Sequence, residues 1–160
     1  MTIRCRVGPV GRRVAVGDVI EVPTSVGLAY AQAIDRKTGM GTLLRVFDAL
    51  FESRPRDLSK VVDRPTRFEC CFPLQAAVNR DIFEVVGHEG VKAPPPKEFK
   101  LRGFIDRDGT IHNWFIVQGE DHHLIESLSE EQKKLPYEEI INDTLLIERI
   151  EDGWRHETGL

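Results

Sequence analysis

The sequence predicts an α+β fold: a mainly antiparallel β-sheet, or a partly open barrel, followed by short acidic helices toward the C-terminus. Up to about residue 119, short apolar or alternating runs are separated by clusters of glycine, proline and polar residues, which is typical of consecutive strands. An Arg-Asp-Gly-Thr turn between two such runs indicates a hairpin. From Ser129 onward, a helix-capping sequence and helical spacing replace the alternation.

The first third of the chain is expected to form a three-stranded meander. DVIEV (18–22) is a β-branched run that stops at Pro23, because proline cannot donate to a ladder of backbone hydrogen bonds. TLLRVFD (42–48) is the third strand. Between them, LAYAQAID (28–35) places large side chains on one face and alanines on the other, which leaves room for close packing. The large residues are Leu28, Tyr30, Gln32 and Ile34, and the alanines are Ala29, Ala31 and Ala33.

The middle of the chain adds a short helix and two strands. Asp57 precedes LSKVV and can cap a helix there, which Pro65 ends. TRFECCF (66–72) and IFEVVG (82–87) are strand-like. In the first of these runs, Cys70 and Cys71 are adjacent, so a strand would direct them to opposite faces as buried, reduced thiols, with Cys5 left over.

From residue 89 to the end, the chain changes from extended to helical patterns. Residues 89–99 contain three consecutive prolines and predict an extended connector. FKLRGFID (99–106) and IHNWFIVQG (111–119) then form the hairpin. Ser129 opens a capping box for one helix. A second helical stretch is expected from Pro136 to about residue 152, which a break at Asn142-Asp143 would divide.

Length and composition fit a single domain over residues 1–160, with 41% hydrophobic and 30% charged residues. The early arginines precede no apolar run of signal-peptide length, so we expect a cytoplasmic protein.

The charge is uneven along the chain. Residues 1–67 carry a net +5, residues 68–118 a net −1 and residues 119–160 a net −8. Such polarity can steer a charged partner, although solvated acidic helices explain it equally well.

No pattern of residues points to catalysis or to a bound cofactor. The five histidines have no metal-ligand spacing, and neither a phosphate loop nor a nucleophile motif is found. We therefore expect no enzyme, metal or cofactor. The alternative is a small metal- or thiol-dependent hydrolase, or a ligand-binding β domain, and it requires His88, His112, His122 or a cysteine to meet in one pocket. The isoelectric point of about 5.8 argues against nucleic-acid binding.

Short motifs along the chain resemble a known family in their order and spacing. Gly17-Asp18-Val-Ile-Glu-Val-Pro23 precedes a turn and then Tyr30-Ala-Gln32-Ala-Ile34. The later matches are Leu44–Asp48, Val86-Gly87-His88 followed by prolines and Phe99, Leu135-Pro136, and Asn142-Asp143 through Arg149-Ile150 to Gly153-Trp154. Over about residues 16–154 the chain resembles the immunity protein 26 family of bacterial polymorphic toxin systems. Ala31 stands where that family usually has glycine.

The resemblance implies a cytosolic antidote that is encoded beside a secreted or contact-delivered toxin. Such a protein binds the toxin domain and occludes its active site, and the resemblance brings no catalytic residues with it. We therefore expect a protein partner, and neither nucleic acid nor a membrane.

Nine residues are candidates for contacting that partner: Glu120, Asp121, Glu130, Glu131, Glu138, Glu139, Trp114, Tyr30 and Gln32. The acids either solvate the surface or occupy the basic cleft of a nuclease toxin as phosphate mimics. Trp114 is either a packing residue or an interface residue. Tyr30 and Gln32 either define the hairpin or face a ligand in the mouth of a barrel, and Asp18 can cap the turn before its strand. The acidic segment 119–160 is expected to form part of the binding face. Reversal of the four acids at 130, 131, 138 and 139 to lysine should therefore slow association and leave the fold intact, because exposed helix charges contribute little stability.

Overall fold

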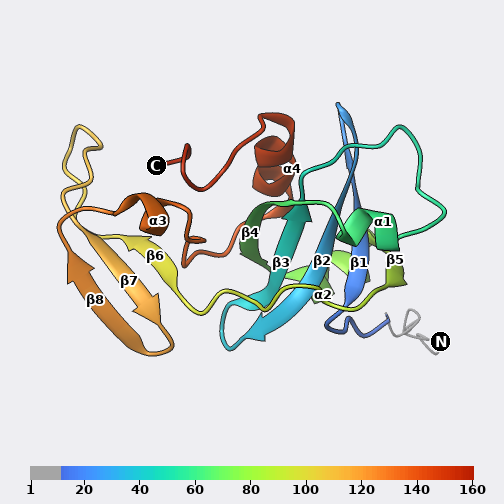
Figure 1. Cartoon of the computed structure of the whole chain (residues 1–160), viewed down its shortest axis with the longest axis horizontal. Helices are drawn as coiled ribbons and strands as arrows, with labels where there is room; N and C mark the ends of the chain where they lie inside the picture. Colours follow the sequence, from blue (N-terminus) through green and yellow to red (C-terminus); the bar gives the residue numbers. More distant parts are fainter. Residues whose placement is uncertain (1–11) are drawn as a thin grey trace, which may run out of the picture.

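The computed structural model describes residues 12–160, and there the chain forms two antiparallel sheets and short helices (Figure 1). The strands are β1 (Asp18–Thr24), β2 (Gly27–Lys37), β3 (Gly41–Phe47), β4 (Thr66–Phe72), β5 (Glu84–His88), β6 (Phe99–Arg102), β7 (Trp114–Gln118) and β8 (Asp121–Ile125). The helices are α1 (Ser59–Val62), α2 (Leu74–Asn79), α3 (Glu130–Lys133) and α4 (Asp143–Glu151). This confirms the α+β class, and the strands do not close into a barrel. Cys5 lies outside the described residues.

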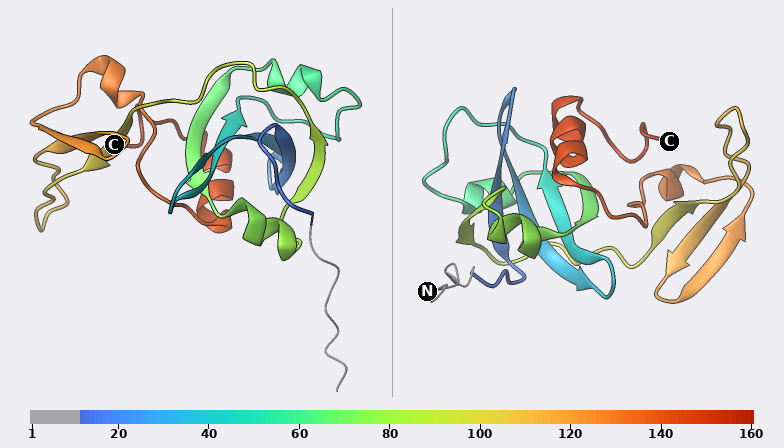
Figure 2. Two further views of the ribbon diagram at one scale, coloured as in Figure 1. Left: turned by 90° about the horizontal axis from the view of Figure 1, so that it is seen from below. Right: turned by 180° about the vertical axis from the view of Figure 1, so that it is seen from behind.

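The larger sheet has the strand order β4-β3-β2-β1-β5, and all of its neighbours are antiparallel. Register shifts between Val19 and Ile20, Ala33 and Asp35, and Val46 and Phe47 bend the strands. The sheet therefore curls, and α4 lies against it (Figure 2).

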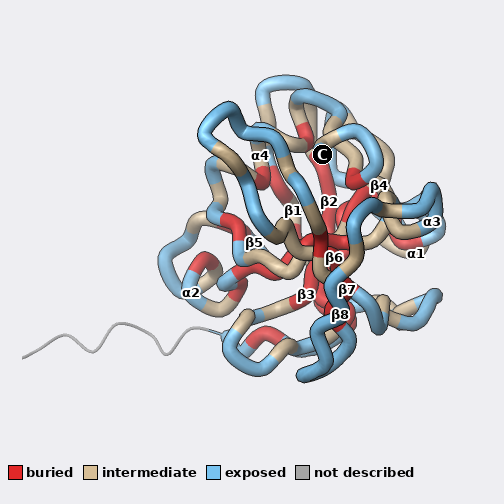
Figure 3. The backbone as a smooth tube through the Cα atoms, turned by 90° about the vertical axis from the view of Figure 1, so that its left-hand side faces the viewer, coloured by how far each residue is buried: buried red, intermediate tan, exposed pale blue. Residues whose placement is uncertain are grey.

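The main core lies on the alanine face of β2, where the sequence predicted room for close packing. Ala29, Ala31 and Ala33 are each at most 1% exposed, and they belong to one cluster with Leu146 and Ile150 of α4. The alanines of β2 and the apolar face of α4 therefore share one core, in which α4 lies against the neighbouring strand β1. Figure 3 shows the buried residues concentrated in the strands, while the turns that join them are exposed.

The opposite face of the larger sheet is covered in two parts. Tyr30 packs with Val61 and Val62 of α1 in one cluster. Ile34 belongs to a second cluster with Phe99 and Val117, which come from the smaller sheet. The second cluster therefore joins the two sheets.

The smaller sheet has the order β6-β7-β8 and is also tied to the larger one by residues 136–142. This strap forms parallel bridges on both sides, from Tyr137 to Lys100 of β6 and from Ile140 to Cys71 of β4. Asn142 then caps α4, because its side chain accepts the backbone N–H of Leu145 at 2.8 Å. The expected helix over 136–142 is wrong, since these residues hydrogen-bond to strand edges rather than within a helix.

The helix α2 and the strand β8 were not predicted. The hairpin around the Asp106–Gly109 turn is confirmed: β6 and β7 are regular only up to Arg102 and from Trp114, but an antiparallel bridge between Ile105 and Ile111 and backbone hydrogen bonds continue the pairing to the turn. The capping box at Ser129 and the opposite faces of Cys70 and Cys71 are confirmed. Both cysteines are buried and free. Among residues 12–160 no helix is long and apolar enough to cross a bilayer.

Candidate functional site

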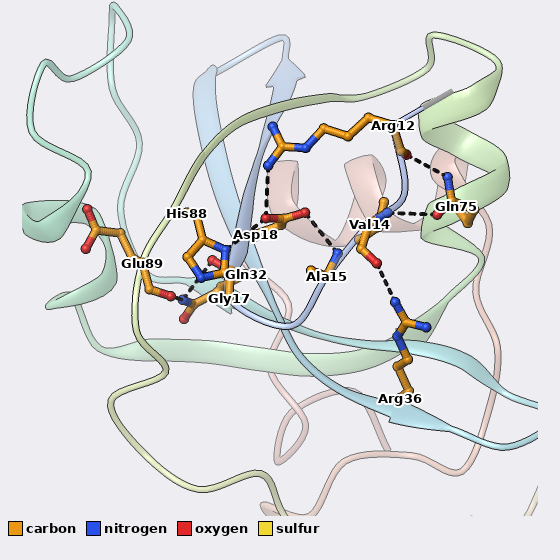
Figure 4. A network of polar contacts seen from close by, with 10 residues as sticks. All are labelled: Arg12, Val14, Ala15, Gly17, Asp18, Gln32, Arg36, Gln75, His88 and Glu89. Atoms are coloured by element: carbon orange, nitrogen blue, oxygen red, sulfur yellow. Dashed lines mark hydrogen bonds and ion pairs between the residues drawn. The ribbon is translucent and has the colours of Figure 1, made fainter. Parts of the chain in front are cut away.

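A polar network at the start of β1 brings together residues from distant parts of the sequence (Figure 4). Asp18 is 1% exposed, and its Oδ2 accepts the backbone N–H of Ala15 at 2.9 Å. Its Oδ1 contacts His88 Nδ1 at 3.0 Å and Arg12 Nη2 at 3.3 Å. The pairing of β1 with β5 places Asp18 opposite His88. Asp18 therefore caps its turn, as predicted, and also fixes the end of β5.

Gly17 is required at this position for two reasons. Its φ of +99° favours glycine, and a Cβ atom there would lie 2.6 Å from Cε1 of His88 and 2.9 Å from the carbonyl oxygen of Glu89. The imidazole of His88 thus lies directly against the backbone of Gly17.

Two buried side chains hold the proline-rich connector against the larger sheet. Gln32 Nε2 donates to the carbonyl oxygen of Glu89 at 2.8 Å and to that of Gly17 at 3.3 Å. Arg45 donates to the carbonyl oxygens of Ala93 at 3.0 Å and Pro94 at 3.2 Å. An extended connector has no ladder of its own, so these donors satisfy its carbonyl groups.

Tyr30 belongs to a second polar group, which includes Glu21 of β1. Its hydroxyl donates to Glu21 Oε2 at 2.7 Å, and Arg54 pairs with both Glu21 and Glu84. Arg54 lowers the pKa of Glu21, while burial and the bond to Glu21 raise the pKa of Tyr30. A surface cavity of about 480 Å³ adjoins this group, with Arg12, Phe83 and Glu84 among its lining residues.

Three of the nine candidate contact residues are buried, which corrects their assignment to a partner surface. Tyr30 and Gln32 are 1% exposed and Trp114 is 7% exposed. Each is committed to the fold: Tyr30 to Glu21, Gln32 to the connector, and Trp114 to packing against Tyr137. Their side chains are therefore not exposed for contact with a partner in this structure.

The six candidate acids divide into paired and unpaired groups. Glu130 and Glu131 pair with Lys133 and Lys134 on α3. Glu138 pairs with Lys37 at 2.5 Å and Glu139 with Arg149 at 2.7 Å, and both acids are only partly exposed. Glu120 and Asp121 are exposed, and within residues 12–160 they form no ion pair.

Within residues 12–160, the structure does not bring the histidines and cysteines together. His88 contacts Asp18, His112 contacts Asp106 at 2.8 Å in the β6–β7 loop, and His122 lies in β8. Burial raises the pKa of the Cys71 thiol to about 11 and also raises the pKa of Cys70, so both are protonated at neutral pH. Among the described residues no group of three or more acidic, histidine or cysteine side chains is arranged to hold a metal ion.

Sequence reasoning missed a buried basic group beneath the C-terminal tail. Lys100 is fully buried, and its Nζ donates to the carbonyl oxygens of Lys133 and, at 2.8 Å, of His156. Burial lowers the pKa of Lys100 to about 8. Burial likewise lowers the pKa of His156 to about 3, with the charge of Lys100 adding to the effect. The sequence around Lys100 does not indicate that its side chain is buried, because the carbonyl groups that accept its hydrogen bonds belong to residues far away in the sequence.

Comparisons with known proteins return no match. No protein-family model, no curated protein and no solved structure is found to be similar to this chain.

Proposed function

We propose that this chain is an immunity protein, which binds a cognate toxin domain in the bacterial cytoplasm and neutralises it by occluding the toxin's active site. It acts by binding alone, without a catalytic residue or a cofactor of its own. The resemblance to the immunity protein 26 family is the origin of the proposal.

The observation that carries the proposal is the meeting of the family-like motifs in the Asp18 network. Gly17 and Asp18 come from the first motif, Gln32 from the second and His88 from the fourth. Asp18 contacts His88, His88 covers Gly17, and Gln32 bonds to the carbonyl of Gly17. Residues that recur together because one fold needs them are expected to touch in this way, which supports the view that the ordered motifs reflect a shared fold.

The positions of the unpaired acids support a binding role as well. Glu120 and Asp121 are exposed in residues 119–160, the most acidic segment of the chain, where a basic partner would be attracted. Toxins that cleave nucleic acids carry basic clefts to bind phosphates, so a nuclease domain is the class of toxin that this charge fits best.

Co-expression tests the proposal directly. The toxin domain encoded beside this chain is placed under an inducible promoter, with and without this chain, and growth is followed after induction. We expect growth to be restored by the wild-type chain and by His88→Gln, because the Asp18–His88 pair serves the fold and not a reaction. The matched negative control is an unrelated immunity protein. Growth arrest in the presence of a soluble, folded chain would contradict the proposal.

A further inference from the structure

The outer edge of the smaller sheet is open, unlike its other edge. Beyond β6, the strap covers the sheet, because Lys100 donates its backbone N–H to Pro136 at 2.8 Å and accepts that of Glu138 at 2.9 Å. β8 pairs with β7 alone, and within residues 12–160 no backbone hydrogen bond joins it to another segment. An uncovered edge is a template for a further strand.

The turn before β8 determines which backbone groups face outward. Gln118 pairs with Asp121 around the two-residue loop Gly119-Glu120, and Gly119 has a φ of +60° as a type II′ turn requires. Such a turn closes on a hydrogen-bonded pair, and the pairs alternate along the ladder. The N–H and C=O groups of His122 and Leu124 therefore point away from β7.

This edge lacks several of the features that natural sheets use to prevent pairing. β8 contains no proline or lysine and has no register shift against β7. Leu124 is 60% exposed and lies opposite Phe115, which gives the edge an apolar contact.

The charge around β8 decides what kind of strand it can accept. Glu120, Asp121 and Glu126 flank the edge, all three are exposed, and no ion pair engages them within the described part of the chain. A second copy of this chain would bring the same acids into an antiparallel pairing, where like charges repel. A basic strand would instead find complementary charge.

We propose that β8 is the docking edge for the toxin domain, and that it accepts an extended basic segment of that domain as a fourth strand. The backbone groups of His122 and Leu124 hold the segment, Leu124 packs against its apolar side chains, and Glu120, Asp121 and Glu126 attract its basic ones. This inference rests on the proposed function and names the surface that performs it.

Hydrogen exchange on the complex with the neighbouring toxin domain, followed by mass spectrometry, tests the inference. We expect the amides of residues 121–125 to become protected on binding, with His122 and Leu124 exchanging at least about tenfold more slowly. Unchanged exchange across β8 in a formed complex would overturn the docking edge and leave the immunity function standing. If the wild-type chain formed no complex at all, both proposals would be wrong.

Two pairs of variants distinguish the contribution of the β8 backbone to binding from that of the acidic side chains. Leu124→Pro removes an N–H that faces away from β7, whereas Leu124→Ala keeps it and loses the same packing. We expect the proline variant to bind at least about tenfold more weakly than the alanine variant.

Reversal of Glu120 and Asp121 to lysine should slow association about tenfold at low salt, while the same reversal of Glu130 and Glu131 should not. Circular dichroism checks each fold. Equal binding within both pairs of folded variants would overturn the inference, and where a variant of one pair is unfolded, equal binding within the other pair would overturn it.

Discussion

Asp18 and His88 are 70 positions apart in the sequence, and their side chains lie 3.0 Å apart. Asp18 is 1% exposed, whereas the side chain of His88 is 58% exposed. The aspartate is therefore the anchor of the network and the histidine lies on its outer side. Three groups depend on the one carboxylate: the backbone N–H of Ala15, the guanidinium of Arg12 and the imidazole of His88.

Removal of the Asp18 carboxylate is predicted to destabilise the fold by about 2 kcal/mol, because hydrogen bonds to a charged acceptor contribute about 1.5–3 kcal/mol. Asp18→Ala should show this loss in urea unfolding. Asp18→Asn keeps an acceptor for Ala15 and should lose less. His88→Ala should lose less than Asp18→Ala, since its side chain is largely exposed. Equal stability of Asp18→Ala and wild type would mean that the network does not hold the start of β1.

Gln32 is predicted to keep the proline-rich connector on the sheet. Gln32→Leu has a similar volume but no donors, so the carbonyl of Glu89 loses its partner and the connector is released at that end. Limited trypsin digestion should then cleave faster after Lys92 and Lys97, and the matched variant Gln32→Glu should behave in the same way. Cleavage at the wild-type rate in both variants would show that Arg45 alone is sufficient.

Charge reversal is predicted to affect two pairs of acids differently, which corrects the expectation drawn from the sequence. Glu138→Lys with Glu139→Lys places like charges against Lys37 and Arg149, whose side chains are 22% and 11% exposed, and should destabilise the fold by about 2 kcal/mol. Glu130→Lys with Glu131→Lys acts at side chains that are 85% and 86% exposed and should change stability by less than about 1 kcal/mol. Thermal unfolding compares the two double variants, and equal losses would contradict the assignment.

His156 is predicted to make the fold sensitive to acid. Its pKa is about 3 in the folded chain, below its ordinary value of 6.5. Between these values the unfolded chain binds a proton that the folded chain does not, so stability falls as pH drops below 6.5. The expected slope is about 1.4 kcal/mol for each pH unit. His156→Gln retains an acceptor for the backbone N–H of Glu69 and should show a shallower loss between pH 6 and 4.5. An unchanged slope in this variant would place the acid sensitivity elsewhere.

The alternation of side chains predicted the larger sheet well, because its central strands place large and small apolar side chains on opposite faces with a period of two. β8 could not be found in this way. Its first four residues are exposed, so an edge strand leaves no apolar alternation to detect. In the strap, by contrast, an apparent helical pattern led to the prediction of a helix that does not form. Ile140 and Ile141 have helical spacing with the residues of α4, yet Ile141 donates its backbone N–H to Cys71 instead.

The candidate site was predictable where partners are close in the sequence. Asp18 bonds to Ala15, three residues away, and a turn-capping aspartate is a local signal. The bonds of Asp18 to His88, Lys37 to Glu138 and Lys100 to His156 depend on strand order and on the strap, which local patterns do not encode. For the same reason, the sequence could not separate the paired acids from Glu120 and Asp121.

Titration of the toxin's own activity with this chain is the most direct test of the account. The neighbouring toxin domain that the proposed function requires is purified from the complex, refolded, and assayed at a fixed concentration against increasing amounts of the wild-type chain. A neutralising binding protein should reduce the activity linearly and abolish it at one chain per toxin domain, with a 1:1 complex on gel filtration. Undiminished toxin activity at a large excess of folded chain would contradict the account.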